Sequence, residues 1–393
     1  MNILMVLETS YPPDERVENE INVLTSRGFR ITLACTRRGG KYGTEEIGDL
    51  TIYRIPVPKF IFKSGAVALI LPFYFWFWNY HLTGIISQSR FDAIHLHDLP
   101  LVKVALKLSR KFKIPLVCDY HENRPEIMKM YRHTRTFPGK YLISIKQWLR
   151  YQLEYTKKAD RLILVTEEAK DYYVSNYGVA PDKIIVLPNY ISLSRFRVYD
   201  GVTGPVSPKE LSFTAVYFGD TGLRRGTLTI LESADILKDR NIRFLIIGDS
   251  RDQDYLETVA GERELTNVTF TGRLPVADAI RLINKCDIGL CPFLRNIHHD
   301  TTYANKMFQY MALGKPVIVS NCTAQANFVV REDCGFVFEA DNPDDLGNQI
   351  IRLTEKEAYD RLSRKARSCV NDKYNWETYG SRLTNLYSGL LMK

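Results

Sequence analysis

The sequence predicts an α/β protein with two doubly wound domains, each built on a mainly parallel sheet covered by helices. Three observations support this prediction. Short apolar runs alternate with amphipathic stretches, and the runs are continuous in Ile, Leu and Val, as expected for parallel strands buried on both faces. A polar segment rich in Gly and Pro interrupts the alternation at residues 198–210. The alternation then restarts, so one βα array follows another.

The first array contains six predicted strands separated by helical stretches. These strands are Asn2–Leu7, Phe29–Cys35, Asp92–His97, Pro115–Tyr120, Arg161–Val165 and Lys183–Leu187. One of the helices is expected over Asp14–Arg27, where Gly28 is a natural stop.

The second array also contains six predicted strands. They are Leu211–Phe218, Ile242–Ile247, Asn267–Phe270, Asp287–Cys291, Pro316–Ser320 and Gly335–Phe338. The resulting division is a first domain at 1–197, a linker at 198–210, a second domain at 211–374, and a C-terminal helix at 375–393 that can pack back on the first domain. A ligand is expected in the crevice between the domains, outside the carboxyl ends of the strands.

The charge of the chain is concentrated in its first half. The 393 residues include 53 Lys or Arg and 45 Asp or Glu, a net charge of +8, and residues 101–150 hold 12 of the basic residues against 3 acidic ones. Such a stretch attracts nucleic acid, anionic lipid or phosphorylated substrates, or is simply a solvated helix surface. The seven cysteines include no CxxC pair, which argues against a zinc ribbon and a disulfide framework and favours buried thiols in a reducing compartment. The first residues lack a signal-peptide pattern, so a cytoplasmic location is expected.

An uncharged, aromatic stretch lies between Ser64 and Ser89. Its hydropathy suggests a transmembrane helix, but Pro72 interrupts it and polar residues follow from Asn79 onward. Aromatic enrichment suits the membrane interface, and a buried core helix is the alternative. We favour interfacial contact, because the basic stretch lies close by in the sequence.

A glycine-rich turn directly follows the first strand of the second array. Gly219, Gly222 and Gly226 surround the pair Arg224 and Arg225. Such a turn offers backbone N–H groups and the positive end of the next helix to a phosphate, and the arginines add full charges. A tight turn without a ligand is the alternative interpretation.

A second motif, residues 301–316, is predicted to form a helix that stops at Gly314 and leads into a strand. Thr301 or Thr302 can cap this helix. The residues of its first turns that would face an anionic group are Asn305, Lys306 and Gln309.

Polar residues also stand at the carboxyl ends of two strands of the first array. They are His95, His97 and Asp98 at one strand and Asp119, His121 and Glu122 at the other. His95 and His97 project to one side of their strand and suggest a metal site, but no third ligand is evident, so no metal is expected. A hydrogen-bonded core imidazole is the alternative for His95.

In order and spacing, these motifs resemble the glycosyltransferases of family 4. That family has the GT-B fold, in which two doubly wound, Rossmann-like domains face a central cleft. The residues that carry the resemblance are 13–20, 92–100, 117–122, 187–189, 224–226 and 305–316.

The resemblance implies a retaining hexosyltransferase that uses a nucleoside diphosphate sugar, UDP- or GDP-linked, and needs no metal or other cofactor. The second domain would bind this donor. The first would present a saccharide or lipid-linked acceptor for cell-surface glycan biosynthesis. An anionic membrane surface, the inner face of the cytoplasmic membrane, is an expected partner, and nucleic acid is not.

The resemblance also assigns roles to individual residues. Arg225 matches the basic residue on the diphosphate, Lys306 is its helper, and His121 matches the active-site histidine close to the donor sugar. The remaining donor-binding candidates are Gly219, Arg224, Gly226, Arg273, Leu274, Thr301, Asn305 and Gln309, with the nucleobase near Arg273 and Leu274. The acceptor-side candidates are His97, Asp98, Glu122 and Arg16.

The sequence departs from the family pattern at two places. Thr301 and Gln309 replace a pair of Glu residues seven residues apart; a Gln carbonyl can accept one ribose hydroxyl, and Asp300 could replace the other carboxylate. Asp220 stands where a basic residue is usual.

Two alternatives to sugar transfer follow. One is a nucleotide-sugar epimerase, for which Glu122 and Asp98 could serve as acid and base. The other is a non-catalytic nucleotide-binding module, suggested by the missing Glu pair.

Overall fold

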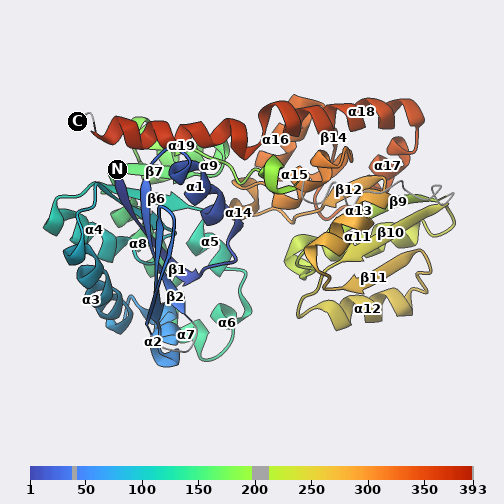
Figure 1. Cartoon of the computed structure of the whole chain (residues 1–393). Helices are drawn as coiled ribbons and strands as arrows, with labels where there is room; N and C mark the ends of the chain where they lie inside the picture. The colour runs from blue at the N-terminus through green and yellow to red at the C-terminus, as the bar shows by residue number, and fades with distance from the viewer. Residues whose placement is uncertain (38–41, 197–211, 392–393) are drawn as a thin grey trace. The chain divides into compact units, whose positions relative to one another are not determined.

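The computed structural model describes residues 1–37, 42–196 and 212–391 and confirms two α/β arrays with mainly parallel sheets (Figure 1). The chain divides into two compact units, Met1–Asn189 with Tyr379–Lys393, and Tyr190–Thr378. The predicted linker at 198–210 lies outside the described residues.

The first unit is built on an eight-stranded sheet in the order β3-β4-β2-β1-β5-β6-β7-β8. Its strands are β1 (Asn2–Ser10), β2 (Arg30–Arg37), β3 (Gly43–Ile47), β4 (Leu50–Pro56), β5 (Ala93–His97), β6 (Leu116–Tyr120), β7 (Arg161–Leu164) and β8 (Ile184–Val186). All neighbouring pairs are parallel except β3 and β4. The order reverses at β1, so the carboxyl ends of β1 and β5 border the crevice in which ligands of doubly wound sheets bind.

The helices of the first unit connect these strands. They are α1 (Glu15–Thr25), α2 (Lys59–Ser64), α3 (Phe73–Gln88), α4 (Val102–Phe112), α5 (Arg124–Met128), α6 (Arg132–Arg135), α7 (Gly139–Leu142), α8 (Ile145–Thr156) and α9 (Glu167–Tyr177). The predicted helix around Glu15–Thr25 is confirmed: the Asp14 carboxylate accepts the Val17 N–H, and Gly28 follows with a φ of +79°.

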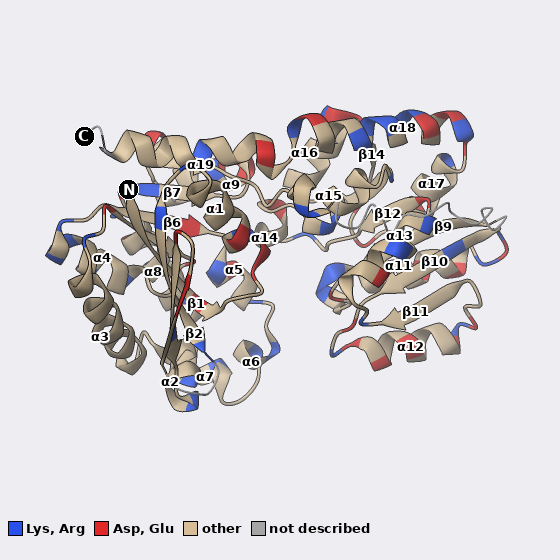
Figure 2. Cartoon of the chain, viewed as in Figure 1, with Lys and Arg blue, Asp and Glu red and all other residues tan. Residues whose placement is uncertain are grey.

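The uncharged stretch forms α3 and the turns before it (Figure 2). Within the described part of the chain, no helix combines the length and the apolar character needed to cross a membrane.

The second unit is built on a six-stranded parallel sheet in the order β11-β10-β9-β12-β13-β14. Its strands are β9 (Phe213–Phe218), β10 (Ile242–Ile247), β11 (Val268–Gly272), β12 (Ile288–Cys291), β13 (Val317–Ser320) and β14 (Gly335–Phe338). Each of the six strands predicted here is confirmed in position. The order reverses at β9, which places the predicted phosphate turn at the switch point of this sheet.

The helices of the second unit follow the same alternation. They are α10 (Leu193–Phe196), α11 (Thr227–Ile236), α12 (Gln253–Glu262), α13 (Val276–Lys285), α14 (Ile297–Asp300), α15 (Asn305–Ala312), α16 (Thr323–Glu332), α17 (Pro343–Leu353) and α18 (Lys356–Ser368). All seven cysteines of the chain are buried, as predicted.

The last helix, α19 (Trp376–Leu391), contributes its residues from Tyr379 onward to the first unit. Gly380 lies so close to α1 that a Cβ there would stand 2.6 Å from a Val23 methyl group. Tyr387 is fully buried, and its hydroxyl lies 2.5 Å from Nδ1 of His95. This end of the chain therefore belongs to the core of the first unit.

Candidate active site

In the first unit, four predicted site residues meet at the carboxyl ends of β5 and β6. His121 Nε2 lies 3.0 Å from an Asp119 carboxylate oxygen and 3.2 Å from His97 Nδ1. The His121 backbone N–H donates to the Asp98 carboxylate over 3.2 Å. Asp98 has a φ of +62°, a conformation that Asp and Asn tolerate better than most residues. The neighbouring parallel strands β5 and β6 thus bring these side chains together at one end of the sheet.

Arg16 reaches this cluster from α1 and is itself buried. Its guanidinium donates to both Asp119 carboxylate oxygens, over 2.8 and 2.7 Å. It also donates to the Leu187 carbonyl over 2.9 Å and to the Asn189 side chain over 2.6 Å. Arg16 therefore ties three segments of the first unit together, and it acts on the site through Asp119.

The two histidines of this cluster differ in charge. Burial opposes protonation of His121, but the carboxylates of Asp98 and Asp119 outweigh it and raise the His121 pKa to about 9. Burial, and then the neighbouring His95, lower the pKa of His97 to about 3. At neutral pH the site therefore presents a His121 cation beside a neutral His97 imidazole.

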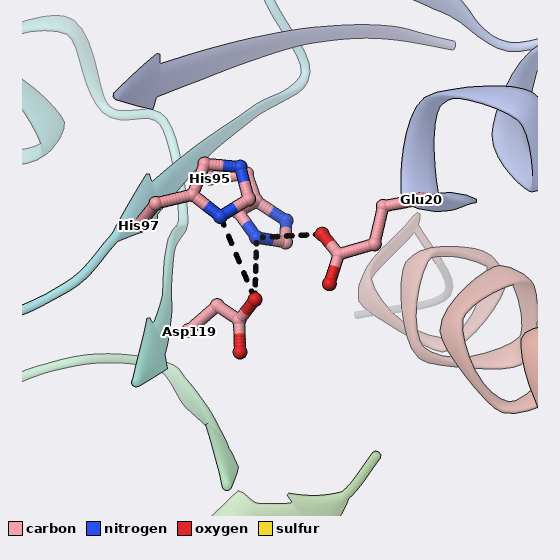
Figure 3. A group of neighbouring side chains, drawn as sticks. All are labelled: Glu20, His95, His97 and Asp119. Atoms are coloured by element: carbon pink, nitrogen blue, oxygen red, sulfur yellow. Dashed lines mark ion pairs between the residues drawn. The ribbon is translucent and has the colours of Figure 1, made fainter. Parts of the chain in front are cut away.

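A possible metal site lies behind these residues (Figure 3). One ligand atom each from Glu20, His95, His97 and Asp119 falls within 4.8 Å of the others, so the expectation that no third ligand accompanies the histidines is wrong. Arg16, however, already supplies a cation to Asp119, and its Nε lies 3.1 Å from Glu20. Burial, and then the Asp119 charge, raise the Glu20 pKa well above its ordinary value. Because the Arg16 guanidinium already lies against both carboxylates, we interpret the group as an ion-pair network around Arg16.

Glu122 lies in a second ion-pair group at the same strand ends. Its carboxylate is 3.5 Å from Arg124, whose guanidinium is 3.4 Å from Glu8. Burial, and then the Asp98 charge, raise the Glu122 pKa to about 7. Glu122 can therefore gain or lose a proton near neutral pH.

In the second unit, the turn from Gly219 to Gly226 joins β9 to α11. Both glycines have positive φ angles, +123° and +75°. A Cβ on Gly226 would stand 1.7 Å from the Pro292 carbonyl oxygen, and a Cβ on Gly248 1.8 Å from that of Gly219. Only glycine fits these positions, because the backbone itself fills the space.

The amides of this turn are engaged more than the sequence predicted. The Gly222 N–H donates to Asp220 over 2.8 Å, and the Leu223 N–H donates to Asp252 over 3.0 Å. Asp252 occupies the N-cap position of α12, yet its side chain makes no cap bond there. The first turn of α11 has no side-chain cap, so its amides, rather than those of the turn, are available to an anion.

The paired arginines of the turn have different surroundings. Arg224 forms a short ion pair with Asp220. Arg225 lies 3.9 Å from the same carboxylate, and its guanidinium sits 4.9 Å from the centre of the Phe293 ring. Asp220, where the family usually has a basic residue, thus partly neutralises this group.

Lys306, in the first turn of α15, points at the same turn. Its ammonium lies 3.4 Å from the centre of the Tyr217 ring and would be 3.3 Å from a Cβ on Gly219. Among the described residues, no carboxylate forms an ion pair with Lys306. Burial lowers its pKa well below the ordinary value, and Arg225 adds to this effect. A bound anion would stabilise the ammonium form.

The start of α15 differs from the prediction. Neither Thr301 nor Thr302 caps the helix; their hydroxyls donate to the Ile297 and His298 carbonyls over 2.7 and 2.9 Å. Ala304 occupies the N-cap position without a side-chain bond. Two threonines followed by a helical pattern predict a cap. However, the short helix α14 precedes them, and its backbone carbonyls accept their hydroxyl hydrogen bonds.

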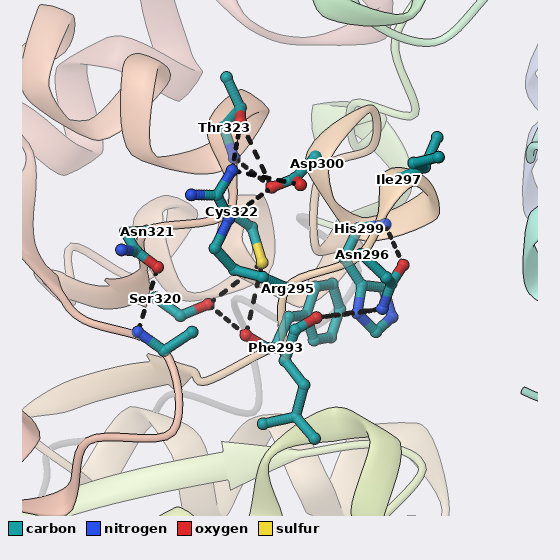
Figure 4. Close-up of polar contacts among 12 residues, drawn as sticks. Phe293, Arg295, Asn296, Ile297, His299, Asp300, Ser320, Asn321, Cys322 and Thr323 are labelled. Atoms are coloured by element: carbon teal, nitrogen blue, oxygen red, sulfur yellow. Dashed lines mark hydrogen bonds and ion pairs between the residues drawn. The ribbon is translucent and has the colours of Figure 1, made fainter.

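The segment before α15 is fixed by Asp300 (Figure 4). Its carboxylate accepts the Thr323 N–H over 3.0 Å and lies 3.2 Å from Arg295 Nε. Asp300 is the residue that could replace the family's sugar-binding carboxylate. In this structure its carboxylate fastens the segment to α16.

The predicted base-binding residues follow β11. Gly248 donates its N–H to Gly272 over 2.9 Å, and Gly219 donates to Ile247 over 2.8 Å. These bonds link the carboxyl ends of β9, β10 and β11. Arg273, which is exposed, and Leu274, which is half-buried, directly follow β11, so they lie at the same carboxyl ends of the strands as the Gly219 turn.

Comparison with known families agrees with this geometry. Residues 15–195 match the family model described as Glycosyltransferase Family 4, and residues 212–356 match the one described as Glycosyl transferases group 1. The structure of Anabaena Alr3699/HepE in complex with UDP superposes with a TM-score of 0.71 at 16% identity, covering 99% of this chain and 100% of that one. The chain is a GT-B glycosyltransferase of the family 4 type.

Two relatives of this glycosyltransferase are similar over most of their length. An uncharacterized glycosyltransferase, MJ1178 of Methanocaldococcus jannaschii, is 22% identical over 95% of this chain and 93% of its own. The UDP-Gal:alpha-D-GlcNAc-diphosphoundecaprenol alpha-1,3-galactosyltransferase of Escherichia coli is 22% identical over 79% of each chain. Glycosyl transfer in glycan biosynthesis is therefore its activity, and neither the epimerase nor the binding-module alternative is favoured.

Sequence reasoning missed two histidines of the glycosyltransferase's second unit. His298 and His299 are buried in α14. Burial, and then the charges of Arg225 and Arg224 among other groups, lower their pKa values to about 3 and about 4. Both are neutral imidazoles close to the arginine pair. The signal available in the sequence was an adjacent His pair between a strand and the 301–316 motif.

Proposed function

We propose that the protein is a retaining glycosyltransferase that moves a hexose from a nucleoside diphosphate sugar, UDP- or GDP-linked. The acceptor is a saccharide or a lipid-linked saccharide used in cell-surface glycan biosynthesis. The enzyme works without a metal, in the cytoplasm and at the inner face of the cytoplasmic membrane. The second domain binds the donor and the first binds the acceptor.

The observation that carries this proposal is the environment of Lys306. Its ammonium is held against Tyr217 without a carboxylate ion-pair partner among the described residues, next to Arg225 and the Gly219 turn. A cation in this setting is costly until an anion arrives, and a diphosphate supplies the missing charge. HepE, which has the same fold, is described as a complex with UDP, and this supports a nucleotide as the ligand.

The same groups favour the chemical step. Cleavage of the glycosidic bond leaves negative charge on the diphosphate oxygen. Lys306, Arg225 and the α11 amides are positioned before the reaction, so they stabilise this charge without reorganising, an effect worth several kcal/mol in typical sites. In this proposal the donor-binding role extends to Gly219, Arg224, Gly226, Arg273, Leu274, Thr301, Asn305 and Gln309.

The first unit supplies the acceptor side. The His121 cation contacts the donor sugar during catalysis, and His97, Asp98 and Glu122 line the acceptor. Arg16 holds Asp119 in place behind them. The E. coli relative acts, by its name, on a diphosphoundecaprenol-linked acceptor, which supports a lipid-linked acceptor here.

A nucleotide-sugar panel tests the donor. UDP- and GDP-sugars are screened by thermal shift, and the products of the stabilising donors are analysed by NMR for the anomeric configuration of the transferred sugar. We expect release of UDP or GDP with retention of configuration. Inversion contradicts the retaining mechanism, and interconversion of the sugar without release contradicts transfer.

Two variants test the assigned roles. Arg225→Ala is expected to weaken nucleotide binding about tenfold or more, since it removes a charged hydrogen-bond donor. His121→Ala is expected to reduce turnover and leave nucleotide affinity within about twofold, because it lies in the other domain. Unchanged binding in the first variant and unchanged turnover in the second would remove both assignments.

A further inference from the structure

Helix α3 presents two different apolar faces. Tyr74, Phe75 and Trp78 are buried in the core of the first unit. Phe73 and Trp76, in contrast, are 47% and 62% exposed, and Tyr80, one turn further along the same face, is 76% exposed. The stretch is thus both a core helix and a surface helix, and its outer face is aromatic.

The segment before α3 extends this outer face. Seven of the eighteen exposed large hydrophobic residues of the described chain lie within residues 60–80, which we call the aromatic patch: Phe60, Phe62, Ile70, Leu71, Phe73, Trp76 and Tyr80. A Cβ on Gly65 would lie 3.3 Å from the Tyr74 ring, so the end of α2 packs against α3. An exposed apolar concentration of this kind marks an interaction surface.

The chain segments that carry the exposed aromatic rings hold charges of one sign. Residues 55–89 contain no Asp or Glu, and Lys59 and Lys63, both exposed, flank Phe60 and Phe62. Residues 127–153 contain six Lys or Arg and again no acidic residue. Figures 1 and 2 place α2, α6 and α7, with their basic residues, at the same end of the first unit.

A second exposed aromatic group lies on this basic segment. Phe137 and Tyr141, at α7, are 83% and 76% exposed, and Lys140 between them is exposed too. Aromatic side chains next to lysines thus recur on two separate segments of the first unit.

We propose that the aromatic patch docks the protein on an anionic phospholipid surface. Trp, Tyr and Phe prefer the level of the headgroups, where an apolar ring and a polar edge are both accommodated. Lys and Arg near such a surface each strengthen binding by about fivefold at low salt. A second copy of the chain is a poorer occupant, because Lys59 and Lys63 of both copies would meet around the apolar contact.

Only the biological role of this docking rests on the proposed function: it would bring the first domain to a lipid-linked acceptor. Binding of the full chain to vesicles of phosphatidylcholine, with and without phosphatidylglycerol, is measured by co-sedimentation at low and high salt. We expect binding that requires phosphatidylglycerol and weakens with salt.

Matched variants locate the surface. Phe73→Ser with Trp76→Ser is expected to lower vesicle partitioning by about tenfold or more, since it removes two exposed rings. Lys59→Glu with Lys63→Glu is expected to act similarly on anionic vesicles only. Tyr255→Ser removes a ring of the second unit that is 51% exposed, and it is expected to change nothing. Circular dichroism checks that each variant is folded.

Three outcomes overturn the proposal. They are equal binding to vesicles without phosphatidylglycerol, unchanged binding of the Phe73/Trp76 variant, and a concentration-dependent dimer in gel filtration that this variant abolishes. Donor turnover, read as UDP or GDP release in solution, is followed separately. Vesicle binding without turnover leaves the docking surface standing and removes the proposed function, whereas turnover without vesicle binding does the reverse.

Discussion

The charge of His121 is set by the residues that face it. Asp98 and Asp119 favour its protonated form, the cation Arg16 opposes it, and the neutral His97 ring lies 3.2 Å from its Nε2. Because the pKa of His121 is raised from 6.5 to about 9, its stabilising effect is fully present below pH 6.5 and is lost as the pH rises through about 9. The site therefore keeps a cation next to the strand ends across the physiological range.

Asp98→Asn tests this charge. Asparagine tolerates the left-handed backbone of Asp98, so the fold should survive, but the carboxylate charge is gone. We expect the His121 pKa to fall by about one to two units, and the alkaline limb of the turnover profile to move down with it. NMR titration of the His121 ring measures the pKa directly.

The control for this variant is Asp182→Asn, which removes an exposed carboxylate elsewhere on the first unit. It should leave the pKa and the profile where they were. If the alkaline limb stays fixed in Asp98→Asn although the His121 pKa falls, His121 is not the group whose charge turnover requires.

Lys306→Met tests the role of the buried Lys306 ammonium. Methionine keeps the apolar contact with Tyr217 and removes the charge, so the free protein should become more stable by about 1 kcal/mol. Nucleotide affinity should fall at least tenfold, because the diphosphate loses a cation. Urea unfolding and calorimetric titration with UDP or GDP measure the two effects; a loss of stability together with unchanged affinity would contradict the role given to Lys306.

At the scale of elements, sequence periodicity predicted the buried parallel strands but not the hairpin of β3 and β4. The buried strands could be predicted because each is a continuous apolar run between helices. β3 is exposed and carries Glu45 and Glu46, so it has no apolar pattern. The Gly48-Asp49 turn, where Gly48 has a φ of +57°, was the one local signal of the hairpin.

For the candidate site, the positions of the main residues were predictable from the sequence, but their interaction partners were not. Strand ends and the Gly219 turn place His121, Arg225 and Lys306 by topology alone, since parallel strands end at one edge. The partners that set their charges were not predictable. Arg16 donates to Asp119, which lies 103 positions later in the sequence. Asp252 accepts a hydrogen bond from the Leu223 N–H, 29 positions earlier. Contacts of this kind follow from packing, and no local pattern encodes them.

The Gly226 turn leads to a prediction at this scale. Gly226→Ala must fit a Cβ against the Pro292 carbonyl at a positive φ, so we expect a loss of about 2 kcal/mol or more in unfolding free energy and weaker nucleotide binding. Gly261→Ala is the matched control. It lies in α12 with open space around its Cβ position, and alanine there should stabilise by about 0.5–1 kcal/mol. Equal effects of both substitutions on urea unfolding would contradict the close contact.

At the scale of the whole molecule, each unit has its own hydrophobic core. The core of the first unit includes the end of the chain, because Leu383, Leu386 and Tyr387 are buried there. Donor binding and the C-terminal helix should therefore stabilise different units. The stabilities of the two units can be measured separately, because a ligand or a substitution changes the stability of the unit that contains it.

We expect differential scanning calorimetry to resolve two transitions. UDP or GDP at a hundred times its dissociation constant should stabilise only the second unit, by about 2.7 kcal/mol. Tyr387→Phe removes the hydroxyl contact with His95. It should destabilise only the first unit, by about 1 kcal/mol or more, and so lower the transition of that unit. If nucleotide shifts the transition that Tyr387→Phe lowers and leaves the other in place, the donor binds the first unit and the assignment of the two domains is reversed.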